Sequence, residues 1–126
     1  RAALLAQVRR HIDSLLRHQN ARGFWPNVLG RPDSPDEVSG TAIYVLALAR
    51  GLRAGWLAGA HYRAAAEAGW RAVASRVEPD GTVHDICMGT MCSEDVEYYV
   101  RRPFYDNDTH GLFAVLFAGI EMHGIR

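Results

Sequence analysis

Polar side chains that can take part in chemistry gather in two stretches of the sequence, residues 20–38 and 78–109. Long stretches of this kind inside a compact domain are usually functional loops. The second stretch, with His110 just after it, combines carboxylates, imidazoles, guanidinium groups, phenols and thiols: Asp80, His84, Asp85, Cys87, Thr90, Cys92, Glu94, Asp95, Glu97, Tyr98, Tyr99, Arg101, Arg102, Asp106, Asp108 and His110. Carboxylates and arginines beside aromatic rings suit a polar, ring-shaped or anionic ligand such as a sugar acid.

Three of these residues, Asp85, Asp108 and His110, are candidates for catalysis, because carboxyl and imidazole groups transfer protons. His84 and Asp85 would form an acid–base pair only if their side chains met. The pattern of residues 83–87 indicates a short strand, in which adjacent side chains point to opposite faces. Asp108 and His110 have a second interpretation, since a carboxylate at a helix N-terminus is stabilised by the helix dipole. Both interpretations, a role in a ligand pocket and a role as a helix cap, remain open for these two residues.

The candidates for substrate binding are aromatic, charged or hydroxylated: Trp25, Glu37, His84, Thr90, Tyr98, Tyr99, Arg102, Asp108 and His110. Each has a structural alternative. Trp25 can stack on a sugar face or pack beneath a loop. Glu37 can contact a ligand or cap the helix that begins near Ser39. Arg102 can hold a sugar or tie its loop to a carboxylate.

Metal and cofactor sites have little support in this sequence. Cys87 and Cys92, with His84 and His110, suggest zinc, but a C-x4-C spacing differs from the closely spaced ligand pairs of zinc sites. We therefore expect no metal, and two reduced cysteines with a disulfide as the alternative in an exported protein. The motifs of serine hydrolases, zincins and nucleotide-binding loops are absent, so these three classes have no support in the sequence.

The composition excludes other classes. Fourteen basic and fourteen acidic residues cancel, which leaves no bulk charge to attract nucleic acid or an anionic membrane. Every basic residue is arginine, which excludes lysine-dependent chemistry. The apolar runs 42–49 and 112–120 are far shorter than the ~20 residues that span a bilayer. We expect no nucleic-acid or membrane partner and, with no signal peptide visible, a cytoplasmic bacterial protein rather than a secreted one.

Hydrophobic periodicity predicts four helices that position these loops, at residues 2–19, 40–54, 60–77 and 110–122. The first and third have one apolar face, whereas the second and fourth are apolar on every side. This alternation predicts an all-α fold of αα-hairpin repeats, with buried inner helices covered by an outer layer. We expect one partial α/α-toroid domain over residues 1–126, made of hairpin units 1–58 and 59–126, with both long loops at one end.

Several motifs carry a family resemblance. In the second unit these are Gly81-x-Val-x-Asp-Ile-Cys-x-Gly-Thr90, Tyr98-Tyr-x-x-Arg-Pro103 and Asn107-Asp-x-His-Gly111. The first unit adds Gln19-x-x-x-Gly-x-Trp25, Glu37-x-Ser-Gly-Thr-Ala42 and Gly51-x-x-x-Gly-Trp-Leu57. In order and spacing the chain resembles the C-terminal part of the unsaturated glycuronyl and rhamnogalacturonyl hydrolases, glycoside hydrolase families 88 and 105.

The resemblance implies a six-hairpin (α/α)6 barrel, of which this chain would supply about four of twelve helices. Such enzymes remove 4,5-unsaturated uronic acid from oligosaccharides without a cofactor. An Asp protonates the double bond, water adds, and the resulting hemiketal collapses. Their general acid lies in the earlier part of the chain, and nothing here matches that segment. The isolated chain is therefore expected to lack the general acid.

A second hypothesis is a non-catalytic helical module that binds carbohydrate or assembles with copies of itself. Four helices cannot fully surround two apolar ones, so exposed apolar surface should favour association. We expect a homo-oligomer, a trimer with twelve helices or a dimer, unless the missing N-terminal part of the same barrel covers this surface.

Overall fold

A computed structural model describes residues 2–125 and contains five helices and two short strands. Their bounds are α1 (Ala2–Leu16), α2 (Val38–Arg53), α3 (Ala60–Ala74), β1 (Ile86–Cys87), α4 (Val96–Val100), β2 (Phe104–Tyr105) and α5 (Thr109–His123). Helices dominate, as the periodicity predicts. None of the helices in the described part of the chain is long and apolar enough to span a membrane.

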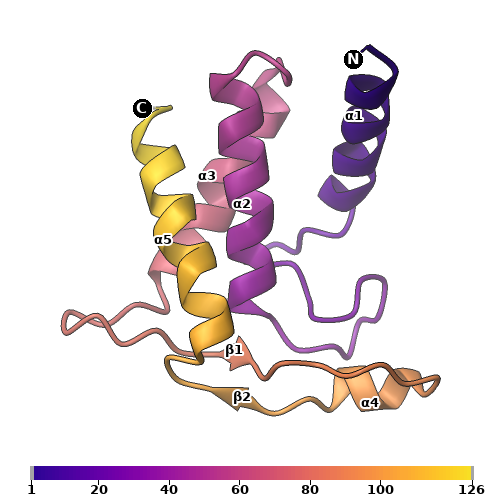
Figure 1. The fold of residues 1–126 in the computed structure, drawn as a ribbon, viewed down its shortest axis with the longest axis vertical. Helices are drawn as coiled ribbons and strands as arrows, with labels where there is room; N and C mark the ends of the chain where they lie inside the picture. Colours follow the sequence, from indigo (N-terminus) through magenta and orange to yellow (C-terminus); the bar gives the residue numbers. More distant parts are fainter. Residues whose placement is uncertain (1, 126) are drawn as a thin grey trace.

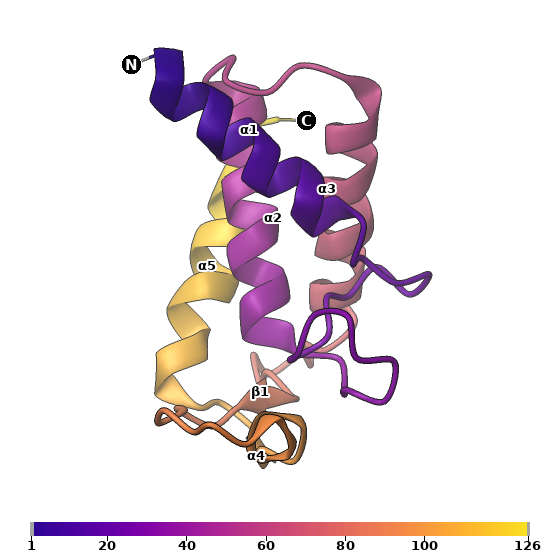
Figure 2. The ribbon, with the colours of Figure 1, turned by 90° about the vertical axis from the view of Figure 1, so that its right-hand side faces the viewer.

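The helices form two layers. In Figure 1, α2 and α5 lie side by side and run in the same direction, whereas α3 lies behind them and runs the opposite way. Helix α2 packs against both α3 and α5. Figure 2 shows α1 on the side of α2 that is away from α5. The inner pair α2 and α5, with α1 and α3 outside it, is the predicted hairpin arrangement of an α/α toroid.

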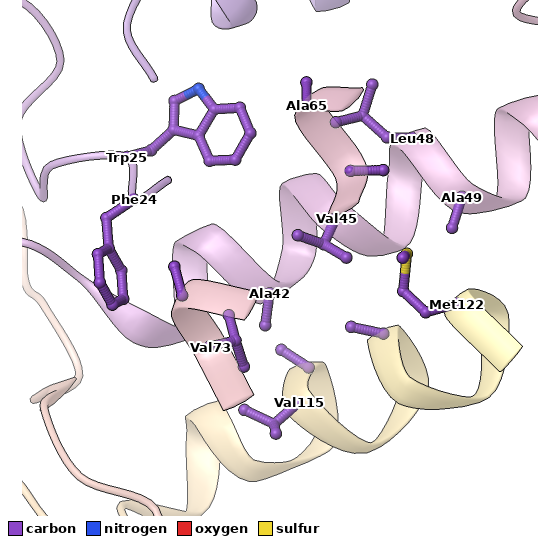
Figure 3. Packing of buried hydrophobic residues seen from close by; sticks show 14 of the residues in the cluster. Phe24, Trp25, Ala42, Val45, Leu48, Ala49, Ala65, Val73, Val115 and Met122 are labelled. Carbon is purple, nitrogen blue, oxygen red and sulfur yellow. The ribbon is translucent and has the colours of Figure 1, made fainter. Parts of the chain in front are cut away.

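The core lies where α2 meets its two neighbours. Ala42, Val45 and Ala49 of α2 are fully buried, between Val73 of α3 and the α5 side chains seen in Figure 3. Small residues let the helices approach closely. A Cβ atom on Gly69 would lie 2.6 Å from Val45 Cγ2, so this glycine sets the spacing between α3 and α2.

An ion-pair clamp joins the inner helices at the end away from the loops. Glu121 of α5 is buried and accepts hydrogen bonds from both Arg50 and Arg53 of α2, at 2.8–3.0 Å. Hydrogen bonds from Arg50, with those from Arg53, hold the pKa of Glu121 below its ordinary value. The clamp therefore fixes how far α5 is shifted along α2.

One apolar face of each inner helix stays exposed, as expected when four helices cannot fully surround two apolar ones. Ile43 of α2 is 42% exposed, and Phe113, Leu116 and Phe117 of α5 are 48%, 68% and 51% exposed. Within residues 2–125, α1 covers the Ile43 side of α2 only in part, since Val8, Ile12 and Ile43 line a groove between the two helices, and no element covers the exposed side of α5. Helices α2 and α5 are therefore apolar all round because one side of each forms the core and the other side is an exposed apolar surface.

The bounds of some helices and strands also differ from the prediction. Helix α1 ends at Leu16 rather than residue 19, because the Gln19 side chain turns to donate to the carbonyls of Gly23 and Ala65. The strand expected over residues 83–87 is reduced to Ile86–Cys87, which pairs antiparallel with β2. Asp85 interrupts it with a φ of 59°. The short helix α4 was not predicted.

Candidate functional site

Both long connections, residues 17–37 and 75–108, lie at the end where α2 and α5 begin (Figure 1). Glu37 joins them. It caps α2, is only 5% exposed, and accepts hydrogen bonds from the Ser39 backbone (2.9 Å), the Ser39 hydroxyl (2.8 Å), the Gly40 backbone and the Cys87 backbone (3.1 Å). With four donors on one buried carboxylate, the geometry favours the capping interpretation of Glu37 over contact with a ligand.

Strand β1 and the first turn of α5 also pack at the start of α2. Together with the hydrogen bonds of Glu37, these contacts form the joint between the two loops. The Val38 backbone donates to the Asp85 carbonyl, and Ile86 is fully buried. A Cβ atom on Gly111 would lie 2.5 Å from Ile86 Cγ2 and 2.9 Å from Ser39 Cβ. Only a glycine at this position lets α5 begin directly on β1 and α2. The joint therefore fixes the positions of the residues on either side of the start of α5.

Asp108 and His110 form a pair at the start of α5. Asp108 caps the helix, and its Oδ1 atom lies 3.2 Å from the His110 backbone nitrogen and 2.6 Å from the ring Nδ1. These hydrogen bonds lower the pKa of Asp108, so its carboxylate is a poor proton donor at neutral pH. A neutral imidazole that donates from Nδ1 keeps Nε2 as an acceptor. Asp108 can therefore cap α5 and orient the His110 ring at the same time.

His84 and Asp85 do not pair with each other. His84 Nδ1 lies 2.8 Å from Asp106 Oδ1, and its Nε2 lies 3.4 Å from Glu78 Oε1. Asp85 instead approaches Arg76 at 3.2 Å. The hydrogen bond with Asp106, with a further contribution from Glu78, raises the pKa of His84 above its ordinary value. The structure therefore favours an ion-pair role for His84 between two segments of the loop.

This raised pKa predicts a pH-dependent contribution to stability. The pairing of protonated His84 is fully present below the unfolded-state pKa of about 6.5 and is lost as pH rises through the folded-state pKa. We expect His84→Gln to lower the melting temperature relative to wild type at about pH 5.5 and to differ less at about pH 8.5. Thermal unfolding followed by circular dichroism measures this. His11→Gln, on the exposed side of α1, is the control, and a wild-type advantage that grows with pH would contradict the assignment.

The loop that carries α4 is tied together by its own side chains. The Arg102 guanidinium lies over the Tyr98 ring, 4.8 Å from its centre, and donates to the Gly89 carbonyl at 2.8 Å. The Tyr99 hydroxyl donates to the Ser93 carbonyl and accepts from its backbone nitrogen. Arg102 and Tyr98 therefore present one charged and aromatic surface, whereas Tyr99 has its hydroxyl occupied.

Burial and the nearby Glu37 carboxylate raise the pKa of the Cys87 thiol, whereas a hydrogen bond with Thr90 and the charge of Arg102 lower it. Thr90 itself is exposed and donates to the Met88 carbonyl at 3.1 Å. Thr90 and Arg102 thus lie near the Cys87 thiol.

Trp25 lies in the hydrophobic core rather than beside the candidate residues at the start of α5. Its ring is 1% exposed, donates from Nε1 to the Leu15 carbonyl at 2.7 Å and meets Tyr44 edge-on (Figure 3 shows its place above α2). The expected stacking on a sugar has no free ring face in this structure. Burial favours the packing alternative.

Both cysteines are free thiols; Cys87 is buried and Cys92 is exposed. Within residues 2–125, no group of three or more His, Cys, Asp or Glu side chains has the arrangement of a metal site.

A curated hydrolase is among the relatives that sequence comparison finds. The chain is 31% identical over 116 residues to an unsaturated 3S-rhamnoglycuronyl hydrolase of Alteromonas sp. (strain LOR). The match covers 90% of this chain and 27% of the relative. The chain thus spans about a quarter of the length of that curated protein.

Solved structures show the same fold. A possible member of the GH105 family from Salmonella enterica matches with a TM-score of 0.89 at 23% identity, over 95% of this chain and 31% of that one. A Clostridium family 105 glycoside hydrolase (C. acetobutylicum ATCC 824) matches at 0.82 with 24% identity, over 96% and 38%. A family 88 glycosyl hydrolase from Bacteroides vulgatus matches at 0.78 with 21% identity, over 97% and 35%.

The predicted family resemblance is confirmed by a family model. The model that matches is Glycosyl Hydrolase Family 88, and it covers residues 1–125. Since this match extends over nearly the whole chain, the chain belongs to Glycosyl Hydrolase Family 88.

Proposed function

We propose that this chain forms part of the substrate pocket of a hydrolase that removes 4,5-unsaturated uronic acid from oligosaccharides by hydrating the double bond. The observation that carries this proposal is the 31% identity, over 90% of the chain, to an unsaturated rhamnoglycuronyl hydrolase. Because that relative is a hydrolase, the proposal is favoured over a non-catalytic carbohydrate-binding module.

The arrangement at the start of α5 suits two tasks in such a reaction. Arg102, stacked on Tyr98, offers a planar cation to a uronate carboxylate. His110, held by Asp108 through Nδ1, offers an acceptor nitrogen that can orient water. Its side chain is 44% exposed and open to a ligand. We assign binding of the uronate to Arg102 and positioning of water to the Asp108–His110 pair.

Protonation of the double bond is a separate requirement. Asp108 does not suit it, since hydrogen bonds from His110 lower the pKa of the Asp108 carboxyl. The family resemblance places the general acid in the earlier part of such chains. We therefore expect the 126-residue chain to bind an unsaturated uronyl disaccharide without consuming its double bond.

Two measurements on the same sample test this proposal. Absorbance of the conjugated double bond should not fall below the protein-free control. Amide chemical shifts in a titration with the disaccharide should change in residues 87–110. Arg102→Gln should weaken this binding about tenfold through loss of a charge-assisted hydrogen bond, whereas Arg101→Gln, its exposed neighbour, should not.

Two outcomes would contradict the proposal. Shifts that are absent, or that fall outside residues 87–110, would remove the binding assignment. Loss of absorbance would show that a general acid is present in this chain, and single Asn substitutions at Asp85, Asp106 and Asp108 would then identify it.

A further inference from the structure

The loop that carries α4, residues 88–103, has little support from the helical layers. Helix α4 contains no buried residue and packs extensively on no other helix or strand within residues 2–125. The loop is closed largely by its own contacts, such as the hydrogen bond from Arg102 to the Gly89 carbonyl. Tyr98 of α4 and Arg102 just after it form the surface that is assigned to the uronate. The position of this surface therefore depends on what holds α4 from outside the loop.

Two side chains of the other long connection, residues 17–37, reach α4 from beside it (Figure 1). The Asn27 side-chain amide donates to the Tyr99 carbonyl at 2.6 Å. The Arg31 guanidinium donates to the Glu97 carboxylate at 2.7 Å. Within residues 2–125, the side-chain hydrogen bonds that enter α4 from outside its loop come from these two residues. These two contacts are here named the α4 bridge.

The residues of the first connection that form the α4 bridge are themselves held in place. Asn27 follows Trp25 by two residues, and Trp25 is buried, with a backbone N–H that donates to the Thr41 hydroxyl at 3.0 Å. Arg31 is held by Asp33, whose carboxylate accepts two hydrogen bonds from the guanidinium at 2.7 and 2.9 Å. The bridge therefore connects α4 to the core of the protein.

The two contacts support α4 in different ways. An isolated exposed ion pair contributes little, because two long side chains have to be ordered to form it. Asp33 already orders Arg31, so pairing with Glu97 costs less side-chain entropy. Asn27 adds a donor for a carbonyl in the last turn of α4, where backbone carbonyls lack helical partners. Loss of either contact should leave α4 more mobile.

We propose that Asn27 and Arg31 are positioning residues for uronate binding, which hold α4 so that Arg102 stays stacked on Tyr98 and open to the carboxylate. The inference rests on the proposed function, because it requires Arg102 to bind the uronate. Groups that bind a ligand have to be held within about 0.5 Å of the productive geometry by the residues that support them. Asn27 and Arg31 therefore act through Arg102 and do not need to touch the ligand.

Affinity for the unsaturated uronyl disaccharide tests this role in the protein at its natural length, by calorimetry or, where the double bond is consumed, as KM. Arg31→Gln should weaken binding about fivefold. Asn27→Asp keeps the size but sets a carboxylate against the Tyr99 carbonyl, and should weaken binding by a similar factor. Arg22→Gln is the matched control and should keep the wild-type affinity, because Arg22 lies in the same connection but pairs with Asp36.

A double-mutant cycle with Arg102→Gln distinguishes positioning from direct contact or general damage to the fold. If Arg31 acts through Arg102, Arg31→Gln should cause no further loss of affinity in the Arg102→Gln background. A loss that stays about fivefold in that background would overturn the positioning role. Wild-type affinity in both the Arg31→Gln and the Asn27→Asp proteins would overturn it as well.

Amide hydrogen exchange without ligand separates failure of this inference from failure of the proposed function. Exchange in residues 96–101 should be several-fold faster in Arg31→Gln and Asn27→Asp than in wild type, with α2 unchanged. Unchanged exchange in a protein that binds the disaccharide would overturn the positioning role alone. Faster exchange in the variants of a protein that does not bind the disaccharide would overturn the proposed function, and the positioning role with it.

Discussion

Replacing Glu37 with alanine is expected to lower the free energy of unfolding by about 3 kcal/mol or more. The change removes the acceptor of four hydrogen bonds at a buried site. It leaves the backbone N–H groups of Ser39, Gly40 and Cys87 without this partner, and α2 loses its cap. Urea unfolding followed by circular dichroism, at fixed protein concentration, measures the loss.

Two further variants make this result specific to the joint. Glu37→Gln keeps the size of the side chain and one acceptor oxygen. Its free energy of unfolding should therefore lie between those of wild type and Glu37→Ala. Glu94→Ala removes an exposed carboxylate from the same loop end and should change stability by less than about 0.5 kcal/mol. A loss below about 1 kcal/mol for Glu37→Ala would show that the joint does not depend on this carboxylate.

Gly111→Ala should destabilise the protein by about 1–3 kcal/mol, although alanine is the better helix former by about 1 kcal/mol. The added Cβ atom would lie 2.5 Å from Cγ2 of the fully buried Ile86. Because Ile86 is held in β1, either α5 or the strand has to move. Steric overlap therefore outweighs helix propensity at this position, and the same unfolding measurement gives the sign.

A double-mutant cycle locates the overlap. Ile86→Ala removes the atom that the new methyl group would meet, so the double variant should lose less stability than the two single losses added together. Gly89→Ala is the control glycine, since a Cβ atom there meets nothing within 4 Å. A Gly111→Ala chain more stable than wild type would contradict the close packing of α5 on β1.

The helical layers are predictable from the sequence because they depend on local periodicity. The α/α arrangement follows from which helices are apolar on one face and which on all faces. The residue that caps α2 is harder to predict from local sequence periodicity. Ser39 has the residue type of a cap, yet Glu37 caps the helix from two positions earlier, because its carboxylate also reaches the Cys87 backbone, 50 residues away.

The pairing within the site depends on tertiary contacts and is not visible in the sequence. Asp106 meets His84 only because β1 and β2 pair, which brings residues 22 positions apart together. Asn107 holds the Val83 backbone from a left-handed conformation, with a φ of 56°. The consecutive Asp-Asn-Asp residues at 106–108 are of the types that favour a tight turn, here just before α5.

The clamp formed by Glu121 with Arg50 and Arg53 has a consequence for the order of folding. It joins residues 68 and 71 positions apart, whereas α2 and α3 are separated by only a short turn. Closing the longer loop costs more chain entropy before any contact forms. We therefore expect the α2–α3 hairpin to form first and α5 to dock late. Until α5 docks, the apolar side of α2 that it covers stays in water, which makes this interval the one most exposed to aggregation.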